Sequence, residues 1–238
     1  MIDTHCHILW GVDDASETMS QSMDMIHLAI ADGIQAIVAT SHVKEGMFEN
    51  DEVSLKEALS KLQEEIKKEN LDIKIYFGGE NYVSHHTMHK LEEGNFVTYH
   101  HGKYMLVEFA WTKNVYDHPT SYLKEIMKKG YVPVIAHPER YEIVHEEYQL
   151  LKTWRDMGCL LQVNRTSILG LDKIAKANQI ANQMLEDDLV DLIASDAHRP
   201  YAPRLPKLSD SYRYVKERYG ENRCKRCFID NPKKVLGI

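Results

Sequence analysis

Several kinds of residue and segment are scarce in this sequence, and each scarcity excludes a class of protein. The 238 residues include only four cysteines, which are too few for a disulfide scaffold in a chain of this length. The 29 Lys and Arg residues are outnumbered by 36 Asp and Glu, so the net charge of −7 offers no general attraction for nucleic acid or an anionic membrane. The apolar runs, such as AIVA, have the length of a strand, and nothing resembles a signal peptide or a membrane span. We therefore expect a cytoplasmic protein that binds no nucleic acid and does not insert into a membrane.

Linkers, internal repeats and low-complexity tracts are also missing, which favours one domain over residues 1–238. Short β-rich runs alternate with helical segments along the whole chain. The strands are expected at residues 2–5, 35–40, 73–78, 104–109, 132–136, 159–164 and 191–195. Seven alternations of strand and helix predict an α/β fold, either a parallel barrel or a doubly wound sheet.

The first predicted helix has clear start and end signals. Thr18 and Gln21 have the spacing of a capping box, and Gly33 is placed to end the helix. The helix expected at residues 53–69 carries one apolar stripe, which we interpret as core packing rather than a cofactor site. Further helices are expected at residues 85–93, 121–129, 146–157, 172–185 and 210–219.

Polar residues follow nearly every predicted strand at its carboxyl end. They are His5 and His7, His42 in ATSH, Glu80 in GGE, Glu108 in LVEFA, His137 in VIAHPER, Asn164, and Asp196 and His198 in IASDAH. The carboxyl ends of all strands in a β/α barrel meet on one face, where active sites are built. We therefore expect these side chains to converge, although each one alone is weak evidence.

The chemistry of this set of side chains points to metal ions. His5 and His7 are two residues apart in an extended segment, so they project from one face while Cys6 points the other way. Imidazoles and carboxylates without thiolates suit manganese, iron or zinc better than copper(I) or a structural cysteine–zinc site. The potential ligands are too many for one ion, and carboxylates can bridge, so two or three divalent ions are expected. Such clusters activate water at neutral pH and assist phosphoryl transfer.

Other patterns look like sites but are interpreted as structural. Cys159 and Arg165 have the C-x5-R spacing of cysteine-dependent tyrosine phosphatases, but the LLQVN between them is an apolar strand without a glycine to let backbone N–H groups wrap a phosphate. Cys224 and Cys227 form a CxxC with no second ligand pair, so Cys227 and Phe228 are expected to face the core from a short helix. The histidine pairs at 85–86 and 100–101 follow no strand end and are interpreted as helix-start and loop residues.

The motifs DTHCH, ATSH, GGE, AHPER and SDAH resemble those of the polymerase-and-histidinol-phosphatase (PHP) superfamily of metal-dependent phosphoesterases. The longer segment from WGVDDASE to MFEN, with VEFA, AHPERY, MGCLLQVNRTS and ASDAH, resembles the bacterial capsule and exopolysaccharide protein-tyrosine phosphatases of the CpsB type. The resemblance covers essentially the whole chain in order. It implies a distorted seven-stranded β/α (TIM-like) barrel in which residues 1–238 form one metal-dependent phosphoesterase domain.

The resemblance also implies a set of metal ligands. The first metal would be held by His5, His7, Glu80 and Asp196, the second by Glu80, Glu108 and His137, and the third by Asp14, His42 and His198. Manganese is the expected ion, with iron and zinc as alternatives. Either Asp13 or Asp14 could serve from the VDD segment; the family points to Asp14, and spacing alone does not decide.

The implied reaction is hydrolysis of a phosphotyrosyl ester by a metal-activated hydroxide. Arg140 and Arg204 match family positions that hold the substrate phosphate, and Arg199 and Arg165 are alternatives. Protonation of the leaving phenolate would fall to His42 or His198 if either is not fully committed as a ligand.

The implied partner is a phosphotyrosyl protein, a bacterial tyrosine autokinase that controls polysaccharide export. Residues 111–122 (WTKNVYDHPTSY) are expected at the rim of the site, where they would contact a peptide.

Two alternative functions stay open at this point. One is a small-molecule phosphatase of the histidinol-phosphate type, which would need an enclosing lid, but the sequence shows no long insertion that would form one. The other is a metal-binding regulatory module without activity, which predicts a missing ligand, and none is missing. The acidic chain disfavours an exonuclease. The sequence does not indicate the oligomeric state.

Overall fold

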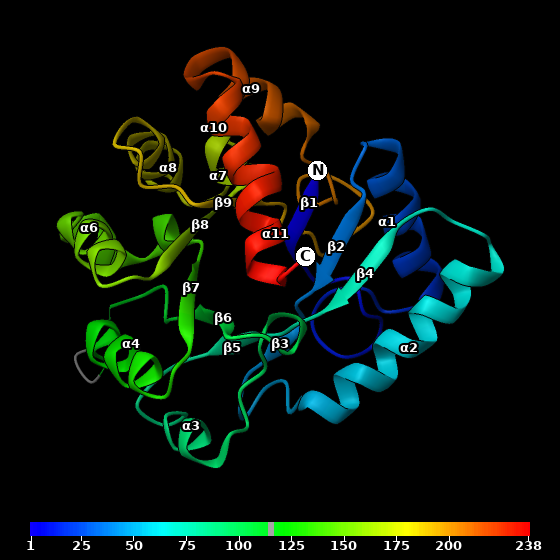
Figure 1. The fold of residues 1–238 in the computed structure, drawn as a ribbon, viewed down its shortest axis with the longest axis horizontal. Coiled ribbons are helices and arrows are strands. Elements are labelled where there is room, and N and C mark those ends of the chain that lie inside the picture. Colours follow the sequence, from blue (N-terminus) through cyan, green and yellow to red (C-terminus); the bar gives the residue numbers. More distant parts are fainter. Residues whose placement is uncertain (114–116) are drawn as a thin grey trace.

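A computed structural model describes residues 1–113 and 117–238 and shows parallel strands arranged as a barrel with helices outside it (Figure 1). Every strand pair within the two hydrogen-bonded sheets is parallel. The strands are β1 Ile2–Cys6, β2 Ala36–Ala39, β3 His42–Val43, β4 Lys74–Phe77, β5 Glu80–Tyr82, β6 Tyr104–Glu108, β7 Val132–Ala136, β8 Leu160–Asn164 and β9 Leu192–Ala194. The predicted α/β fold is therefore confirmed, and the barrel is found rather than the doubly wound sheet.

Among the described residues, the barrel wall has seven strand positions, and two of these positions are each occupied by two short strands instead of one continuous strand. One sheet has the order β1-β2-β4 and the other has the order β3-β5-β6-β7-β8-β9. Strands β2 and β3 follow each other at one of these positions, and β4 and β5 follow each other at the next. The ring closes between β9 and β1, where the Asp196 N–H donates to the His5 carbonyl (2.8 Å) and the His7 N–H donates to the Ala197 carbonyl (2.9 Å).

Gly78 and Gly79 make the break between β4 and β5 possible. A Cβ atom on Gly78 would lie 2.8 Å from Val38 Cγ1, and one on Gly79 would lie 2.9 Å from Val97 Cβ. No side chain fits at either position without displacing its neighbours, so glycine is required for close approach. The break allows β4 to pair with β2 while β5 pairs with β3 and β6. Its consequence for the site is that Glu80 begins a separate strand.

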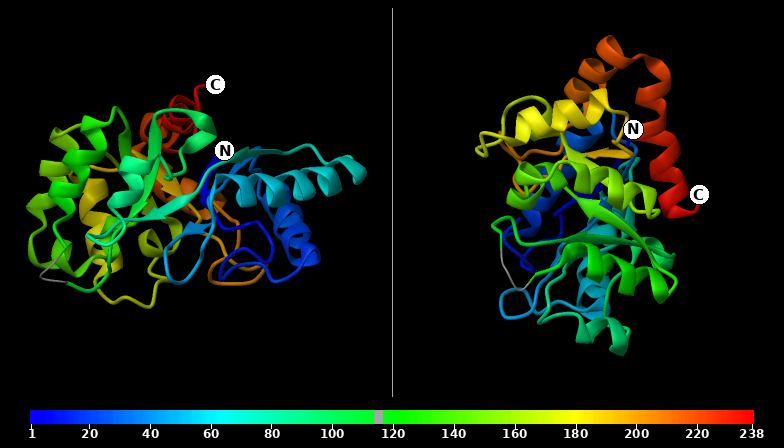
Figure 2. Two further views of the ribbon diagram at one scale, coloured as in Figure 1. Left: turned by 90° about the horizontal axis from the view of Figure 1, so that it is seen from below. Right: turned by 90° about the vertical axis from the view of Figure 1, so that its left-hand side faces the viewer.

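The barrel interior is apolar at one end. Side chains that include Val38, Leu106 and Val134 pack there with Tyr99, whose hydroxyl donates to the Thr4 carbonyl (3.0 Å). Val235 and Leu236 of helix α11 (Asn231–Leu236) join this cluster. Helix α11 crosses the middle of the barrel in Figure 1, and the right-hand view of Figure 2 shows the loops on the opposite side. The amino ends of the strands are thus closed, and the polar carboxyl ends are left for the site.

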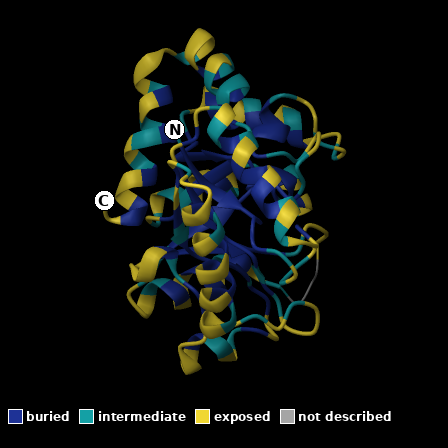
Figure 3. Ribbon diagram, turned by 90° about the vertical axis from the view of Figure 1, so that its right-hand side faces the viewer, coloured by how far each residue is buried: buried dark blue, intermediate teal, exposed yellow. Residues whose placement is uncertain are grey.

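The helices cover the outside of the barrel, with buried strands inside and exposed outer helix faces (Figure 3). Their bounds are α1 Met19–Ala31, α2 Glu52–Lys68, α3 His89–Glu93, α4 Pro119–Lys128, α5 Glu142–Glu146, α6 Gln149–Asp156, α7 Arg165–Ile168, α8 Ala177–Glu186, α9 Ser209–Tyr219, α10 Glu221–Lys225 and α11. The Thr18 side chain caps α1 by accepting from the Gln21 N–H (3.3 Å), but the Gln21 side chain accepts from Glu17 rather than completing a capping box. Among the described residues, none of the helices is long and apolar enough to cross a membrane.

Three predicted helices are shorter or split, because side chains near their starts make local turns. The segment 85–93 is helical only in α3, since the Thr87 hydroxyl donates to the Tyr82 carbonyl and accepts from the Ser84 N–H. The segment 172–185 is helical only from α8 onward, since the Asp172 carboxylate accepts from the Ile174 N–H. The segment 146–157 is helical mainly in α6, since Glu147 leaves the helical region of φ and ψ and separates α6 from α5, which ends at Glu146.

Candidate metal centre

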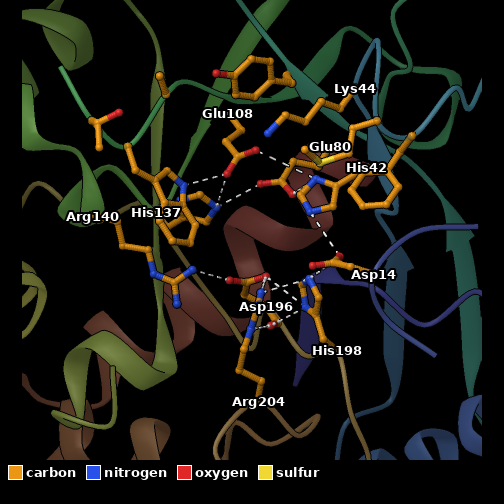
Figure 4. Close-up of a pocket in the computed structure, with 16 residues that line it drawn as sticks. Asp14, His42, Lys44, Glu80, Glu108, His137, Arg140, Asp196, His198 and Arg204 are labelled. Carbon is orange, nitrogen blue, oxygen red and sulfur yellow. Dashed lines mark hydrogen bonds and ion pairs between the residues drawn. The ribbon is translucent and has the colours of Figure 1, made fainter. Parts of the chain in front are cut away.

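The carboxyl ends of the strands open onto a pocket of about 490 Å³. All nine residues predicted as metal ligands lie in or directly behind this pocket, and Figure 4 shows how those that line it point toward one another. His5 and His7 form the buried floor, with Nε2 atoms 3.4 Å and 3.2 Å from Glu80 Oε2. The expected convergence of the strand ends is therefore present in the fold.

An irregularity in β1 brings both of its histidines to the pocket. Ile2 packs inside the barrel, so regular alternation would point His5 outward. The register of β1 against β2 shifts between Asp3 and Cys6, and this bulge turns His5 inward with His7. The two Nε2 atoms lie 3.1 Å apart, while Cys6 packs into the outer core, as the spacing predicts.

Four groups of side chains each place their ligand atoms within 4.8 Å of one another. The groups are His7, Asp14, His42 and His198; His5, His7 and Asp196; His5, Glu80 and His137; and His42, Glu80 and Glu108. Every ligand predicted from the sequence belongs to at least one group, and Glu80, at the centre, belongs to two. The pairing differs from the implied sets in that Glu108 groups with His42, although His137 Nε2 is only 3.8 Å from Glu108 Oε1. The division of ligands among individual ions stays a prediction.

The buried carboxylates of the cluster favour positive charge on the groups around them. Burial lowers the pKa of His5, but the carboxylates of Glu80 and Asp196 outweigh burial and raise this pKa to about 9. Burial likewise lowers the pKa of His7, but hydrogen bonding and charge interaction with Asp13, together with Glu80, raise it to about 9. The carboxylates thus draw cations into a site with little access to water, where an unpaired charge is costly. Divalent metal ions would supply the positive charge that neutralises these carboxylates.

The hydrogen bonds behind the floor also fit metal ligation. Asp13 Oδ2 lies 2.9 Å from His7 Nδ1, and Gln162 Oε1 lies 2.7 Å from His5 Nδ1. Each partner engages one ring nitrogen and leaves Nε2 aimed at the carboxylates, which is the usual arrangement for histidines that bind metals. The Nδ1 atom of His42 faces Glu80 Oε2 at 3.1 Å but is buried without a hydrogen bond. The donor set therefore fits divalent metal ions.

The structure separates the two aspartates between which the sequence spacing did not decide. Asp14 Oδ1 lies 3.4 Å from His198 Nε2 and 3.6 Å from His42 Nε2, and Asp14 lines the pocket. The Asp13 carboxylate is buried and, besides contacting His7, accepts from the His42 N–H at 3.0 Å. Asp14 lies among the potential ligands, and Asp13 orients the histidines behind them.

Arg140 and Arg204 both line the pocket, and both pair with Asp196 (Figure 4). Arg140 Nη1 is 2.8 Å from Asp196 Oδ2, and Arg204 Nη2 is 2.7 Å from Asp196 Oδ1. Arg140 is buried and also donates to Asp172 from Nε at 2.8 Å, so its guanidinium is held on two sides. Two fixed cations therefore face the potential ligands across the pocket.

The alternative arginines lie outside the pocket lining. Arg165 forms two hydrogen bonds with the Asp210 carboxylate and donates to the Pro203 carbonyl. Arg199 donates to the Ala15 and His198 carbonyls. Both arginines therefore bind segments around the site without lining the pocket.

Sequence reasoning missed several residues that support or line the site. Asn164, noted only as a strand end, donates to Asp196 Oδ2 at 2.7 Å and accepts from Gln162 Nε2 at 2.8 Å. A polar Gln162 inside the apolar run LLQVN is the signal that was available for it. Trp111 donates from Nε1 to Glu108 Oε1 at 2.8 Å and lies over Arg140. Sequence reasoning places Trp111 in the predicted rim segment but predicts neither of these two contacts.

The backbone is unusual where two candidate ligands leave their strands. His137 after β7 has φ of 33° and Asp196 after β9 has φ of 51°, in the left-handed region that non-glycine residues rarely occupy. Such conformations persist where surrounding interactions impose them, and they cluster at functional sites. Here they turn both side chains into the pocket.

The residues interpreted as structural are placed accordingly. Cys159 and Arg165 lie at opposite ends of β8, about 20 Å apart at the rise of an extended strand. Burial raises the pKa of the Cys159 thiol to about 12. Cys224 and Cys227 are buried and donate to the carbonyls of Tyr212 and Val190. Neither cysteine pattern resembles a reactive site.

The histidine pairs also lie away from the cluster. His100 and His101 belong to a 3-10 turn before β6 and pack on Tyr76 and Phe77. His85 and His86 precede α3 in a turn rather than starting a helix. Of the predicted rim segment, Trp111 and Thr112 line the pocket, and residues 114–116 lie outside the described residues.

Comparison with known proteins agrees with this geometry. A family model for capsular polysaccharide synthesis proteins, CpsB/CapC, matches residues 1–237. The tyrosine-protein phosphatase CpsB of Streptococcus agalactiae is 32% identical over 240 residues, covering 99% of this chain and 98% of that protein. The tyrosine-protein phosphatase YwqE of Bacillus subtilis is 32% identical over 203 residues, covering 83% and 77%.

Solved structures show the same fold. A chain from the crystal structures of YwqE from Bacillus subtilis and CpsB from Streptococcus pneumoniae, described as unique metal-dependent tyrosine phosphatases, matches with a TM-score of 0.89 and 27% identity over 100% of this chain and 94% of that one. Histidinol phosphate phosphatase from Lactococcus lactis, solved with zinc, L-histidinol and phosphate, has a TM-score of 0.53 at 15% identity, covering 85% and 88%. The second likeness concerns the fold alone.

Metal binding at this cluster is testable by stability and metal content. Mn²⁺ at about 100 times its dissociation constant should add about 2.7 kcal/mol to the free energy of unfolding. Glu80→Gln should lose most of the bound metal, because the Glu80 carboxylate lies within 3.4 Å of ring nitrogens of four histidines, His5, His7, His42 and His137. Metal content is measured by mass spectrometry of the dialysed protein, and stability by thermal unfolding.

The matched control is the double variant Cys224→Ala and Cys227→Ala, which should bind as much metal as the unaltered protein. Loss of metal in this variant, with full retention in Glu80→Gln, would show that the ligands are elsewhere.

Proposed function

Because the chain belongs to the CpsB/CapC family of capsular polysaccharide synthesis proteins, we propose that it is a metal-dependent protein-tyrosine phosphatase. The observation that carries this proposal is the convergence of nine imidazole and carboxylate side chains, with two arginines, around one pocket of a chain related to such phosphatases over its whole length. The catalytic domain spans residues 1–238.

The residues proposed to hold the metal ions are those predicted from the sequence. His5, His7, Glu80 and Asp196 would hold the first ion, Glu80, Glu108 and His137 would hold the second, and Asp14, His42 and His198 would hold the third. Divalent ions in such a site, manganese by preference and iron or zinc as alternatives, supply Lewis acidity and lower the pKa of water, so that a nucleophile forms at neutral pH. The close packing of the ligand atoms and the outer hydrogen bonds to His5 and His7 support this assignment.

Arg140 and Arg204 are proposed to bind the phosphoryl oxygens. Both guanidinium groups are already held by protein contacts, so little reorganisation is needed when negative charge grows in the transition state. Arg140 is oriented by Asp172 and Asp196, and Arg204 also contacts the Asp196 carbonyl. A phosphoryl group between these arginines and the ligand cluster would be neutralised from two sides.

The leaving phenolate requires a proton, and we assign this role to His42 or His198 on the condition that the histidine concerned is not fully committed as a ligand of the third ion. Both side chains line the pocket, and both lie within 3.6 Å of Asp14. Phe48 stacks on the His42 ring, and Trp111 forms another part of the pocket wall. These aromatic side chains suit a substrate whose phosphate is attached to a phenyl ring.

The substrate proposed is a phosphotyrosyl protein, and within the family's role a tyrosine autokinase that controls capsule or exopolysaccharide synthesis in the cytoplasm. A protein substrate needs a pocket that is accessible from outside. In the described part of the chain, the segments around the pocket include no long insertion that would enclose a small metabolite. A histidinol-phosphate-type activity is therefore the second candidate, and a regulatory module without activity is the third.

The proposal is tested first by phosphate release from a phosphotyrosyl peptide and from histidinol phosphate, each with Mn²⁺ and with a chelator. Release from the peptide should depend on metal and should exceed release from histidinol phosphate, because the pocket is open and walled by aromatic rings. A preference for histidinol phosphate would move the assignment to small-molecule metabolism. No release from either substrate with metal bound would favour the regulatory module.

The role of the arginines is tested with Arg204→Ala. Loss of one charge-assisted hydrogen bond to the phosphoryl group should lower kcat/KM for the peptide about 100-fold. Lys207→Ala is the matched control, since this lysine belongs to the same loop but pairs with Asp210 outside the pocket. A change of less than about threefold in Arg204→Ala would remove this residue from the mechanism.

The C-x5-R pattern is tested with Cys159→Ser. This variant should keep most of its activity, and orthovanadate should inhibit the enzyme less than metal removal does, because the thiol is buried at the far end of β8 from the pocket. Loss of activity at normal metal content would instead support a cysteine nucleophile.

A further inference from the structure

A second pocket adjoins the catalytic one. It has a volume of about 250 Å³, and Trp111, Arg140 and Arg204 line both cavities. We call this second cavity the flanking pocket and define it by its own wall, which includes Leu171, Ile174 and Pro203. Since Arg140 and Arg204 are the residues proposed to hold the phosphate, anything bound in the flanking pocket lies beside the phosphorylated residue.

The flanking pocket has the size and lining expected for one apolar side chain. Its volume is below the range of about 300–1,000 Å³ typical of small-molecule sites. Leu171, Ile174 and Pro203 present aliphatic surface, and Trp111 lines both this pocket and the pocket that holds the candidate metal ligands. A single large aliphatic or aromatic side chain would therefore gain free energy by leaving water here.

Exposed apolar residues concentrate around the two pockets. Leu171 is 44% exposed and Trp111 is 42% exposed, and Met47, which lines the catalytic pocket, is 62% exposed. These are three of only six large apolar side chains recorded as exposed among the described residues. Exposed apolar side chains that lie together at the opening of a pocket are typical of a surface that contacts another protein.

We propose that the flanking pocket binds an apolar side chain that lies within two residues of the phosphotyrosine in the substrate protein. This inference rests on the proposed phosphatase function, because the continuity of the two pockets through Trp111, Arg140 and Arg204 is what places the subsite beside the phosphate. The preferred substrate is thus a segment with an apolar residue close to the phosphotyrosine.

The test uses metal-loaded enzyme and five phosphotyrosyl peptides. One has alanine at the two positions on each side of the phosphotyrosine, and the other four carry a single leucine at one of these positions. Leucine at one position at least should raise kcat/KM about tenfold over the alanine peptide, since its larger side chain buries more apolar surface. Leu171→Asp and Ile174→Ser should each reduce this gain to below about twofold.

Val53→Ser is the matched control, because Val53 is an exposed apolar residue at the start of α2 and lines neither of the two pockets. The leucine gain should persist in this variant. Free phosphotyrosine, assayed with every enzyme, reports on the catalytic pocket independently of the flanking residues.

The outcomes separate this inference from the function on which it rests. Hydrolysis of all five peptides at equal kcat/KM, or a leucine gain that survives both Leu171→Asp and Ile174→Ser, would overturn the subsite and leave the phosphatase assignment in place. Failure of the unaltered enzyme to hydrolyse any phosphotyrosyl substrate, including free phosphotyrosine, would overturn the phosphatase function and the subsite with it.

Discussion

The concentration of negative charge at the carboxyl ends of the strands is the constraint on which the rest of this structure depends. Glu80 and Asp196 are buried, and burial by itself opposes their ionised forms. The rings of His5 and His42 beside Glu80, and Arg204, His5 and Arg140 around Asp196, hold the pKa values of both carboxyls well below their ordinary range. The fold must therefore keep cations in place, and it does so with arginines, histidines and the space between them for divalent ions.

Hydrogen bonds between strands hold the barrel together next to the region where charge is concentrated. The seam between β1 and β9 is held by Asp3, whose carboxylate accepts from the Ser195 backbone N–H at 3.0 Å and from the Ser195 hydroxyl at 2.5 Å. Helix α11 closes the other end of the barrel with apolar side chains. One end of the barrel thus supplies stability through apolar burial, and the other end holds the costly polar cluster. Hydrogen bonds from Asp13, Gln162 and Asn164 orient the candidate ligands. Asp13 contacts His7, Gln162 contacts His5, and Asn164 contacts Asp196.

The surface around the site has a different character from its floor. The floor is charged and buried, whereas the mouth presents Met47, Trp111 and Leu171 to solvent. A free metabolite would gain little from such a mouth, but a protein segment would bury part of it on binding. In the proposed function, the arginines would neutralise the phosphoryl group and the apolar mouth would contact the protein segment that carries it.

The sequence by itself determined the α/β fold class and which imidazole and carboxylate side chains gather at the strand ends, because strand periodicity and strand-end residues are local properties. Tertiary structure decided which of Asp13 and Asp14 faces the pocket, which arginines line it, and that Gln162 supports His5, because these depend on side-chain direction across distant strands. It also decided where helices start, since the Asp172 carboxylate turns its own backbone while binding Arg140. The flanking pocket lay beyond sequence reasoning for the same reason: its walls come from segments far apart in the chain, and only packing brings them together.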